Sequence, residues 1–143
     1  MIYRQLTEEL QKWSERDNRK PLVLRGARQV GKTTLVNELG KKYDVYIKLN
    51  LEKSSDAEIF AKSDNVKEIY QYICLKKKIK VDECKRTLLF IDEIQNEPKA
   101  VGLLRYFYEE MPWLHIIAAG SRLQTLIKQR ISFPVGRVDY LSL

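Results

Sequence analysis

The sequence predicts an α/β fold in which a five-stranded, mostly parallel sheet is flanked by helices in three layers. Three observations predict it. Apolar runs rich in β-branched residues alternate along the chain with segments whose apolar residues have helical spacing. The run 87–91 is continuously apolar, which is typical of a central parallel strand covered on both faces. A glycine-containing segment, 26–33, separates the first such strand from a helix, and this alternation favours a parallel sheet with right-handed crossovers.

The first half of the chain predicts two helices and two strands. Apolar residues recur at steps of three and four over residues 3–15, which predicts an amphipathic helix. After a polar linker, Pro21 introduces a strand at 22–25, and the helix that follows the segment 26–33 continues to about Lys41. Residues 45–51 carry β-branched and aromatic side chains and predict the second strand.

The second half predicts helical segments over 55–62 and from Asn65 onward, where Glu68 would complete a capping box. The strand at 87–91 follows. Asn96 is expected to cap the next helix, with Pro98 in its first turn. Strands at 115–119 and 138–143 flank a helical segment that begins near 121.

Length and composition favour one domain, residues 1–143, with a single core. No apolar stretch approaches a membrane span and the N-terminus does not resemble a signal peptide, so we expect a cytoplasmic protein without a membrane partner. Cys74 and Cys84 are expected to be free thiols, and with a single histidine a Cys/His metal site is disfavoured. The chain stops on the apolar segment 140–143. This favours the N-terminal part of a longer protein over a natural terminus that is held in the sheet.

The net charge of +7 favours polyanionic partners, with nucleotide and DNA as the candidates. The densest basic run is 76–80. We interpret it as the solvated end of a helix, since charge runs usually mark solvated surface and cations suit a helix C-terminus.

The segment 26–33 has the pattern G-x-x-x-x-G-K-T of a phosphate-binding loop. Its glycines permit backbone N–H groups to approach phosphate oxygens closely, and the helix N-terminus adds a positive dipole end. Lys32 is expected to contact the β- and γ-phosphates of ATP, and the Thr33 hydroxyl to bind Mg²⁺. The predicted nucleotide-binding residues are Gly26, Ala27, Arg28, Gln29, Val30, Gly31, Lys32, Thr33, Thr34 and Ser121.

A second motif, the Walker B pattern, is an apolar strand that ends in two acidic residues, Asp92 and Glu93. Asp92 is predicted to hold Mg²⁺ and Glu93 to act as the general base that polarises the attacking water. Ligands bind at the carboxyl edge of the strands in an open α/β sheet, which is where this pair would lie. A polar strand end without a catalytic role is the alternative interpretation.

Three further residues are weaker candidates. Ser121 follows the fourth strand and is either a sensor of the γ-phosphate or a helix cap. Arg137 is either an arginine finger, acting on a neighbouring subunit, or a surface arginine in a structural ion pair. Gln95 either helps to position water or faces solvent in a loop.

These segments resemble the prokaryotic AAA-type ATPases. The resemblance rests on RGARQVGKTTL at 25–35, FIDEIQ at 90–95, AGS at 119–121 and FPVGRV at 133–138, and it extends over nearly the whole chain. It implies a P-loop NTPase fold of the additional-strand type with Mg-ATP as the ligand. It also implies a second, C-terminal domain of poorly defined function.

The sequence therefore predicts Mg-ATP binding and hydrolysis that acts as a conformational switch, with a homo-oligomer as a candidate assembly. Two alternatives stay open. One is a nucleotide or small-molecule kinase with a phosphoryl acceptor in place of water. The other is a nucleotide-gated DNA-binding module with little turnover, in which a basic surface contacts the DNA.

Overall fold

A computed structural model describes residues 2–25, 31–120, 133–134 and 136–142. The helices are α1 (Ile2–Ser14), α2 (Gly31–Gly40), α3 (Ser54–Ala57), α4 (Val66–Lys77) and α5 (Pro98–Glu110), with short 3₁₀ turns η1 (Glu58–Ala61) and η2 (Ile94–Asn96). The strands are β1 (Leu22–Arg25), β2 (Val45–Asn50), β3 (Thr87–Asp92), β4 (His115–Ala119) and β5 (Asp139–Ser142).

The five strands form one sheet in the order β2-β3-β4-β1-β5, and every neighbouring pair is parallel. β4 lies between β1 and β3, so it separates the strand before the phosphate-binding motif from the strand that ends in Asp92. This arrangement confirms the predicted five-stranded α/β fold of the additional-strand type. The parallel order also brings the carboxyl ends of β1, β3 and β4 to one edge of the sheet.

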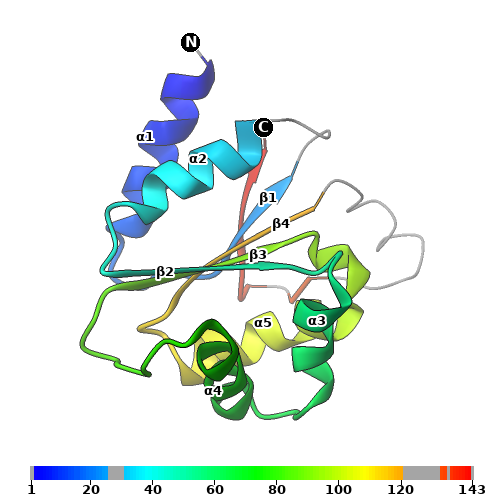
Figure 1. Ribbon diagram of the computed structural model, residues 1–143. Coiled ribbons are helices and arrows are strands. Elements are labelled where there is room, and N and C mark those ends of the chain that lie inside the picture. The colour runs from blue at the N-terminus through cyan, green and yellow to red at the C-terminus, as the bar shows by residue number, and fades with distance from the viewer. Residues whose placement is uncertain (1, 26–30, 121–132, 135, 143) are drawn as a thin grey trace.

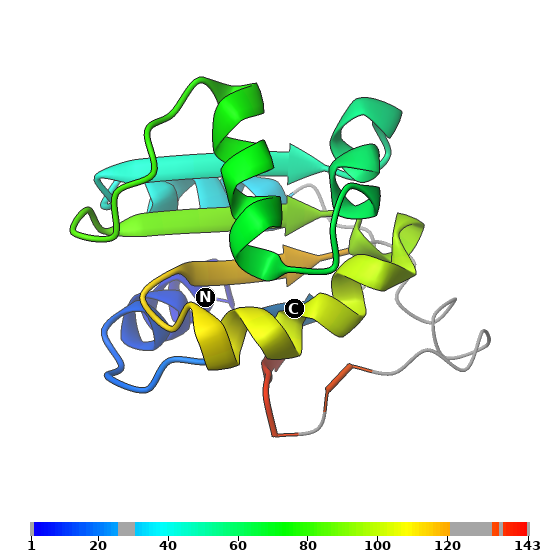
Figure 2. The same ribbon diagram turned by 90° about the horizontal axis from the view of Figure 1, so that it is seen from below.

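Helices cover both faces of the sheet, as Figure 1 shows, with α1 and α2 on one face and α3, α4 and α5 on the other. The view from below shows α4 and α5 crossing in front of the strands (Figure 2). Alternate strand residues pack into two separate cores. Leu88 and Phe90 join the core under α1 and α2, whereas Leu89 and Ile91 join the core under α4 and α5. Burial of both faces explains why the run 87–91 is apolar throughout.

Polar contacts tie the C-terminal end of α1 to the amino ends of the strands. Trp13 is 2% exposed, and its Nε1 donates to the backbone oxygen of Lys20 at 2.8 Å. Arg86, just before β3, donates to the oxygen of Ser14 at 3.1 Å, which satisfies a terminal carbonyl of the helix. The Tyr43 hydroxyl forms a hydrogen bond with Nδ1 of the buried His115. This end of the sheet therefore holds α1 in place.

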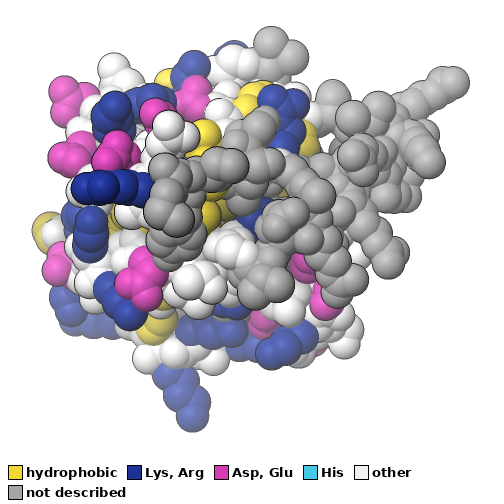
Figure 3. All heavy atoms as spheres, turned by 90° about the horizontal axis from the view of Figure 1, so that it is seen from above, with side chains coloured by type: hydrophobic (Ala, Val, Ile, Leu, Met, Phe, Trp, Pro, Cys, Tyr) yellow, Lys and Arg dark blue, Asp and Glu magenta, His cyan; other side chains and the backbone are white. Residues whose placement is uncertain are grey.

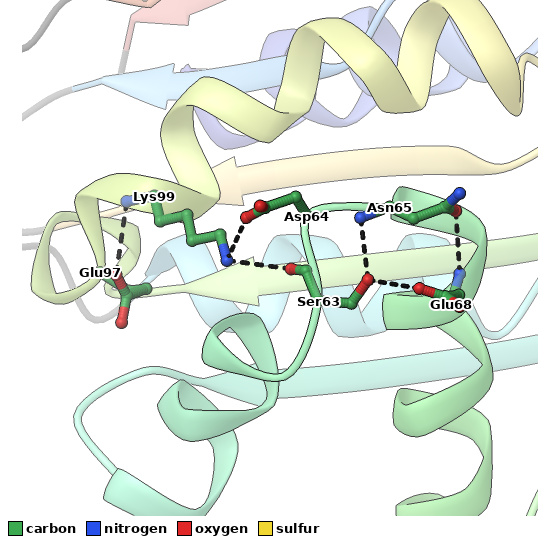
Figure 4. Close-up of polar contacts among 6 residues, drawn as sticks. All are labelled: Ser63, Asp64, Asn65, Glu68, Glu97 and Lys99. Carbon is green, nitrogen blue, oxygen red and sulfur yellow. Dashed lines mark hydrogen bonds and ion pairs between the residues drawn. The ribbon is translucent and has the colours of Figure 1, made fainter.

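Two sequence-based predictions about helix starts need correction. The cap of α5 is Glu97, whose Oε1 accepts from the N–H of Lys99 at 3.3 Å (Figure 4), whereas Asn96 lies in η2. Pro98 occupies the first helical position, so the residue directly before it becomes the cap. At α4, Asn65 caps as predicted, but Glu68 bonds to the Ser63 hydroxyl (2.6 Å) instead of to the backbone of Asn65.

The segment predicted as a helix over 55–62 is the short α3 followed by the 3₁₀ turn η1. The basic run 76–80 is not simply a solvated helix end. Lys76 and Lys77 lie 3.0 and 3.7 Å from Oδ1 of Asp56, a carboxylate that is 4% exposed at the residue level. Cys74 and Cys84 are free, as predicted. Among the residues that the structure describes, no helix has both the length and the apolar character needed to cross a membrane.

Candidate nucleotide and magnesium site

The candidate site lies at the carboxyl edge of the sheet, where β1, β3 and β4 end. In Figure 1 this is the side toward which the β2 and β3 arrows point. The structure places Gly31, Lys32, Asp92 and Glu93 at element ends on this edge. The predicted site residues Gly26, Ala27, Arg28, Gln29, Val30 and Ser121 lie outside the described residues.

Lys32 is in the first turn of α2 and is only 6% exposed. Its Nζ donates to the backbone oxygen of Gly120, directly after β4, at 3.1 Å. The carbonyl that accepts from this ammonium carries no charge to balance it, and the N-terminus of the helix adds a positive dipole end. The position therefore favours an anionic ligand. Of the two threonines that follow, Thr33 is half-buried and Thr34 is exposed.

Asp92 is the last residue of β3 and is half-buried. Its Oδ1 accepts the backbone N–H of Glu93 at 2.9 Å. Burial raises the pKa of the Asp92 carboxyl, and the adjacent charge of Glu93 raises it further, while the Glu93 N–H and the charges of Lys48 and Lys32 oppose the shift. A carboxylate in this setting gains from a cation that neutralises it.

Lys48 is a functional candidate that we did not predict from the sequence. It lies opposite Phe90 in the β2–β3 pairing, and its Nζ is 5.9 Å from the centre of the Phe90 ring. Asp92, two residues beyond Phe90, shares that face of the sheet. The alternation of apolar and polar residues was visible in the sequence, since Lys48 stands between Ile47 and Leu49, both of which are buried. That Lys48 and Asp92 share one face of the sheet became apparent only from the pairing register of β2 on β3.

Glu93 has a left-handed backbone, with φ 54° and ψ 45°. For a residue with a side chain this conformation costs on the order of 1 kcal/mol, and such residues concentrate at functional sites. Gln95 Nε2 donates to Oε2 of Glu93 at 2.6 Å. Gln95 is 8% exposed, so the alternative interpretation of a solvent-facing loop residue is wrong. The amide holds the carboxylate of the predicted base.

Arg137 contacts α5 within this chain. Its Nε lies 3.1 Å from Oε1 of Glu109, an oxygen that Arg105 also contacts at 3.1 Å. This contact is the structural ion pair that we considered for Arg137 in the sequence. A role on a neighbouring subunit stays a prediction.

The donor set fits a magnesium ion bound together with a nucleotide. Mg²⁺ in phosphoryl-transfer sites takes one or two protein oxygens, with phosphate oxygens and water completing its coordination. The Asp92 carboxylate and the Thr33 hydroxyl carry oxygen atoms of this kind. Within the described part of the chain, no group of three or more His, Cys, Asp or Glu side chains is placed to hold a metal ion.

The fold is shared with several proteins of known structure. The Walker-type ATPase paby2304 of Pyrococcus abyssi matches with a TM-score of 0.54 and 19% identity, over 95% of this chain and 52% of that one. The ORC1 protein of Aeropyrum pernix, solved in complex with DNA, matches with a TM-score of 0.57 and 18% identity, over 98% and 43%. PCH-2 of C. elegans matches with a TM-score of 0.53 and 16% identity, over 96% and 41%.

This chain therefore spans only about half the length, or less, of these three structures. No curated protein matches it in sequence. The family model described as an AAA domain matches residues 18–143, which is nearly the whole chain. Together with the strand order and the nucleotide-site residues, this match shows that the chain belongs to the AAA domain family of P-loop ATPases.

Proposed function

We propose that this domain binds Mg-ATP at the carboxyl edge of its sheet, hydrolyses it, and acts as a conformational switch. The observation that carries the proposal is the buried ammonium of Lys32. It lies at the start of α2 and at the same sheet edge as the Asp92–Glu93 pair. A buried ammonium that donates to a neutral carbonyl, at the sheet edge that also carries two carboxylates, suits a ligand that combines phosphates with a divalent cation.

Each residue has a distinct part in this proposal. Lys32 exchanges the Gly120 carbonyl for phosphate oxygens and neutralises their charge. The Thr33 hydroxyl and the Asp92 carboxylate hold the magnesium ion, which supplies further neutralisation of the phosphates when it is bound. Glu93 orients water and accepts its proton, and Gln95 fixes the orientation of that carboxylate through the 2.6 Å hydrogen bond.

Replacement of the base tests hydrolysis separately from binding. Glu93→Gln should bind ATP with unchanged affinity and turn it over about 10²- to 10⁴-fold more slowly, because general-base catalysis contributes that much. Binding is measured by calorimetry with Mg-ATP and turnover by phosphate release. Glu97→Gln is the matched control, since this glutamate lies on the same loop but caps α5. Unchanged turnover in Glu93→Gln would remove Glu93 from the role of base.

A kinase is the alternative that shares this site. The adjacent acidic pair favours water as the nucleophile, because Glu93, directly after the predicted metal ligand Asp92, can act as the base that activates water. An assay with and without added nucleoside monophosphates and sugars separates the two functions. ADP release that requires an acceptor, with no basal hydrolysis, would favour the kinase.

DNA is a second candidate ligand, suggested by the net charge and by the DNA complex of the ORC1 protein named above. The face that carries α1 and α2 shows lysine and arginine side chains interspersed with acidic ones (Figure 3). This mixture does not favour a continuous basic surface on the visible part of that face. Steeply salt-dependent DNA binding that survives Lys32→Ala would support the DNA-binding alternative.

A further inference from the structure

A cavity of about 500 Å³ lies at the amino end of the sheet, away from the candidate nucleotide site. Three segments line it: the linker after α1, the segment before β3, and the residues around the start of β4. No residue of the proposed Mg-ATP site is among the lining residues. The cavity has the size of a ligand site, so we asked which ligand its charges suit.

Two arginines in the lining, Arg19 and Arg86, are half-buried and bond only to backbone oxygens. Arg19 Nη1 donates to the oxygens of Ser14 and Arg16 at 3.3 and 2.9 Å. Arg86 donates to the oxygens of Lys42 and Ser14 at 3.3 and 3.1 Å. Within the described part of the chain, neither arginine forms an ion pair with a carboxylate. Both guanidiniums therefore keep a positive charge that no acidic side chain neutralises.

The two guanidiniums lie close to each other. They share one acceptor, the backbone oxygen of Ser14, so a nitrogen of each is within hydrogen-bond reach of the same atom. Their fields also reach His115, which lines the same cavity: burial lowers the pKa of this histidine, and the charges of Arg19 and Arg86 lower it as well. Like charges at this separation repel, and an anion bound to both would relieve the repulsion.

Each guanidinium retains N–H groups for a ligand. Nη2 of Arg19 and Nε of Arg86 have no hydrogen-bond partner among the described residues, and neither is one of the buried atoms that lack a partner, so both are accessible. Aromatic rings hold the two groups in place. The guanidinium carbon of Arg86 lies 4.4 Å from the centre of the Tyr43 ring, and that of Arg19 lies 5.9 Å from the Trp13 ring. A guanidinium that is fixed in this way suits the oxygens of a carboxylate or a phosphate group.

The acidic residues of the lining leave the two arginines unpaired. Glu15, Asp17 and Glu83 are exposed, and none of them forms an ion pair among the residues that the structure describes. Salt screens the charges of exposed groups strongly and those of partly buried groups less. The half-buried cations therefore decide which ligand the cavity favours.

We propose that this cavity binds an oxyanion, either a carboxylate or a phosphate group, between Arg19 and Arg86. The bound group connects the linker after α1 with the segment before β3, so it stabilises the folded domain. This site lies at the other end of the sheet from the proposed Mg-ATP site and does not depend on ATP hydrolysis.

NMR titrations of the ¹⁵N-labelled protein at constant ionic strength test the site, with inorganic phosphate as one ligand and N-acetylglycine as the other. We expect saturable shifts of the backbone amides of Cys84 and Lys85 and of the ring signals of His115, which is the single histidine of the chain. Saturation with one ligand only would support the site and identify the group as phosphate or carboxylate. N-acetylglycinamide, which lacks the carboxylate, should cause no saturable shift. Equal shifts with this amide, or saturation with neither anion, would overturn the proposal.

Phosphate binding at the proposed nucleotide site is separated by Lys32→Ala. This variant removes the phosphate contact at the carboxyl end of the sheet, so the shifts of Cys84, Lys85 and His115 should persist in it. Their loss in Lys32→Ala would assign them to the nucleotide site and overturn the proposal. Their persistence in a protein that does not bind ATP would preserve this site and refute the proposed function.

Charge-neutral variants locate the contact. Arg86→Gln should weaken the anion about tenfold, which corresponds to the loss of one charge-assisted contact, and Arg19→Gln should do the same. Arg16→Gln is the matched control, because Arg16 lines the same cavity but already lies 3.3 Å from Asp139. It should bind as the wild type does. Equal weakening in all three variants would show a diffuse charge attraction and overturn the site.

Both arginines also bond to the end of α1, so circular dichroism must show that each variant is folded. A measurement on the unaltered protein covers the case in which neither is. Saturating anion should raise the midpoint of thermal unfolding of the wild type above that in sodium chloride of equal ionic strength. An equal midpoint in the two salts would contradict binding to the folded state.

Discussion

The two ends of the sheet bury polar side chains in different ways. At the amino end, His115, Tyr43, Trp13 and Arg86 bond to one another or to backbone oxygens, and they connect segments up to 72 residues apart. At the carboxyl end, the start of α2 carries the buried ammonium of Lys32, and the end of β3 carries two adjacent carboxylates and a left-handed backbone. Polar groups at the first end connect segments of the fold, whereas we propose that those at the second bind Mg-ATP.

Each end also holds one buried atom without a hydrogen-bond partner among the described residues. At the amino end it is Nε of Arg19, whose guanidinium still donates to the Ser14 and Arg16 oxygens. At the carboxyl end it is Oε1 of Gln95, beside an open cavity. Arg19 also lines a cavity, of about 500 Å³, so an unsatisfied atom beside a cavity does not by itself distinguish the two ends.

Removal of Trp13 should produce the largest loss of stability. Trp13→Ala leaves a cavity in the core under α1 and removes the bond to Lys20, so the free energy of unfolding should fall by about 3–5 kcal/mol. Trp113→Ala, at a half-buried residue, should cost less. Denaturant unfolding followed by circular dichroism measures both. An equal loss in the two variants would contradict the structural role given to the amino end.

Acid should destabilise the domain through His115. Burial, together with the nearby charges of Arg19 and Arg86, lowers the pKa of this histidine to about 3. Because the unfolded chain takes up a proton near the ordinary pKa of about 6.5, the contribution of neutral His115 is fully present above that pH. It is lost as the pH falls from about 6.5 toward 3, at up to about 1.4 kcal/mol per pH unit.

The pH dependence of stability in His115→Gln checks this origin. Glutamine retains a hydrogen-bonding group for Tyr43 but does not titrate. Between pH 6 and 4, the free energy of unfolding of the variant should therefore fall less steeply with pH than that of the wild type, by a slope that corresponds to about one bound proton. The loss of stability that follows from the lowered pKa of Asp56 occurs at more acidic pH and should be the same in the wild type and in His115→Gln. Parallel curves for wild type and variant would show that His115 is already protonated in the fold.

The smallest effect on stability is expected for Gln95→Leu. This change removes an amide whose oxygen has no partner, and replacement by an apolar group of similar size is nearly neutral, so the unfolding free energy should change by less than about 1 kcal/mol. Turnover of ATP should fall, since Glu93 loses its positioning hydrogen bond. A stability loss as large as that of Trp13→Ala would show that Gln95 serves the fold.

Much of the fold and part of the site were predictable from the sequence. The β1 strand, the buried β3 run and the positions of Lys32, Asp92 and Glu93 follow from apolar periodicity and from motifs with a fixed local geometry. The cap of α5 was also within reach, because a proline at the first helical position assigns the cap to Glu97.

Other features depend on contacts between distant segments. The cavity beside Glu93 needs the segments after β2 and β3 side by side, and the pairing of Lys76 and Lys77 with Asp56 needs α3 against the end of α4. The approach of Lys48 to Asp92 requires the register of β2 on β3. Local periodicity carries no information about these distances, so only the three-dimensional structure revealed them.

The central claim is that the carboxyl edge of the sheet is a nucleotide site, and calorimetric titration with Mg-ATP tests it most directly. Lys32→Ala should lose about 10- to 100-fold in ATP affinity, because a buried charged contact with phosphate is removed. Lys67→Ala, at an exposed lysine on α4, should bind as the wild type does. Tight ATP binding that Lys32→Ala retains at the wild-type affinity, in a variant that is folded by circular dichroism, would contradict the account.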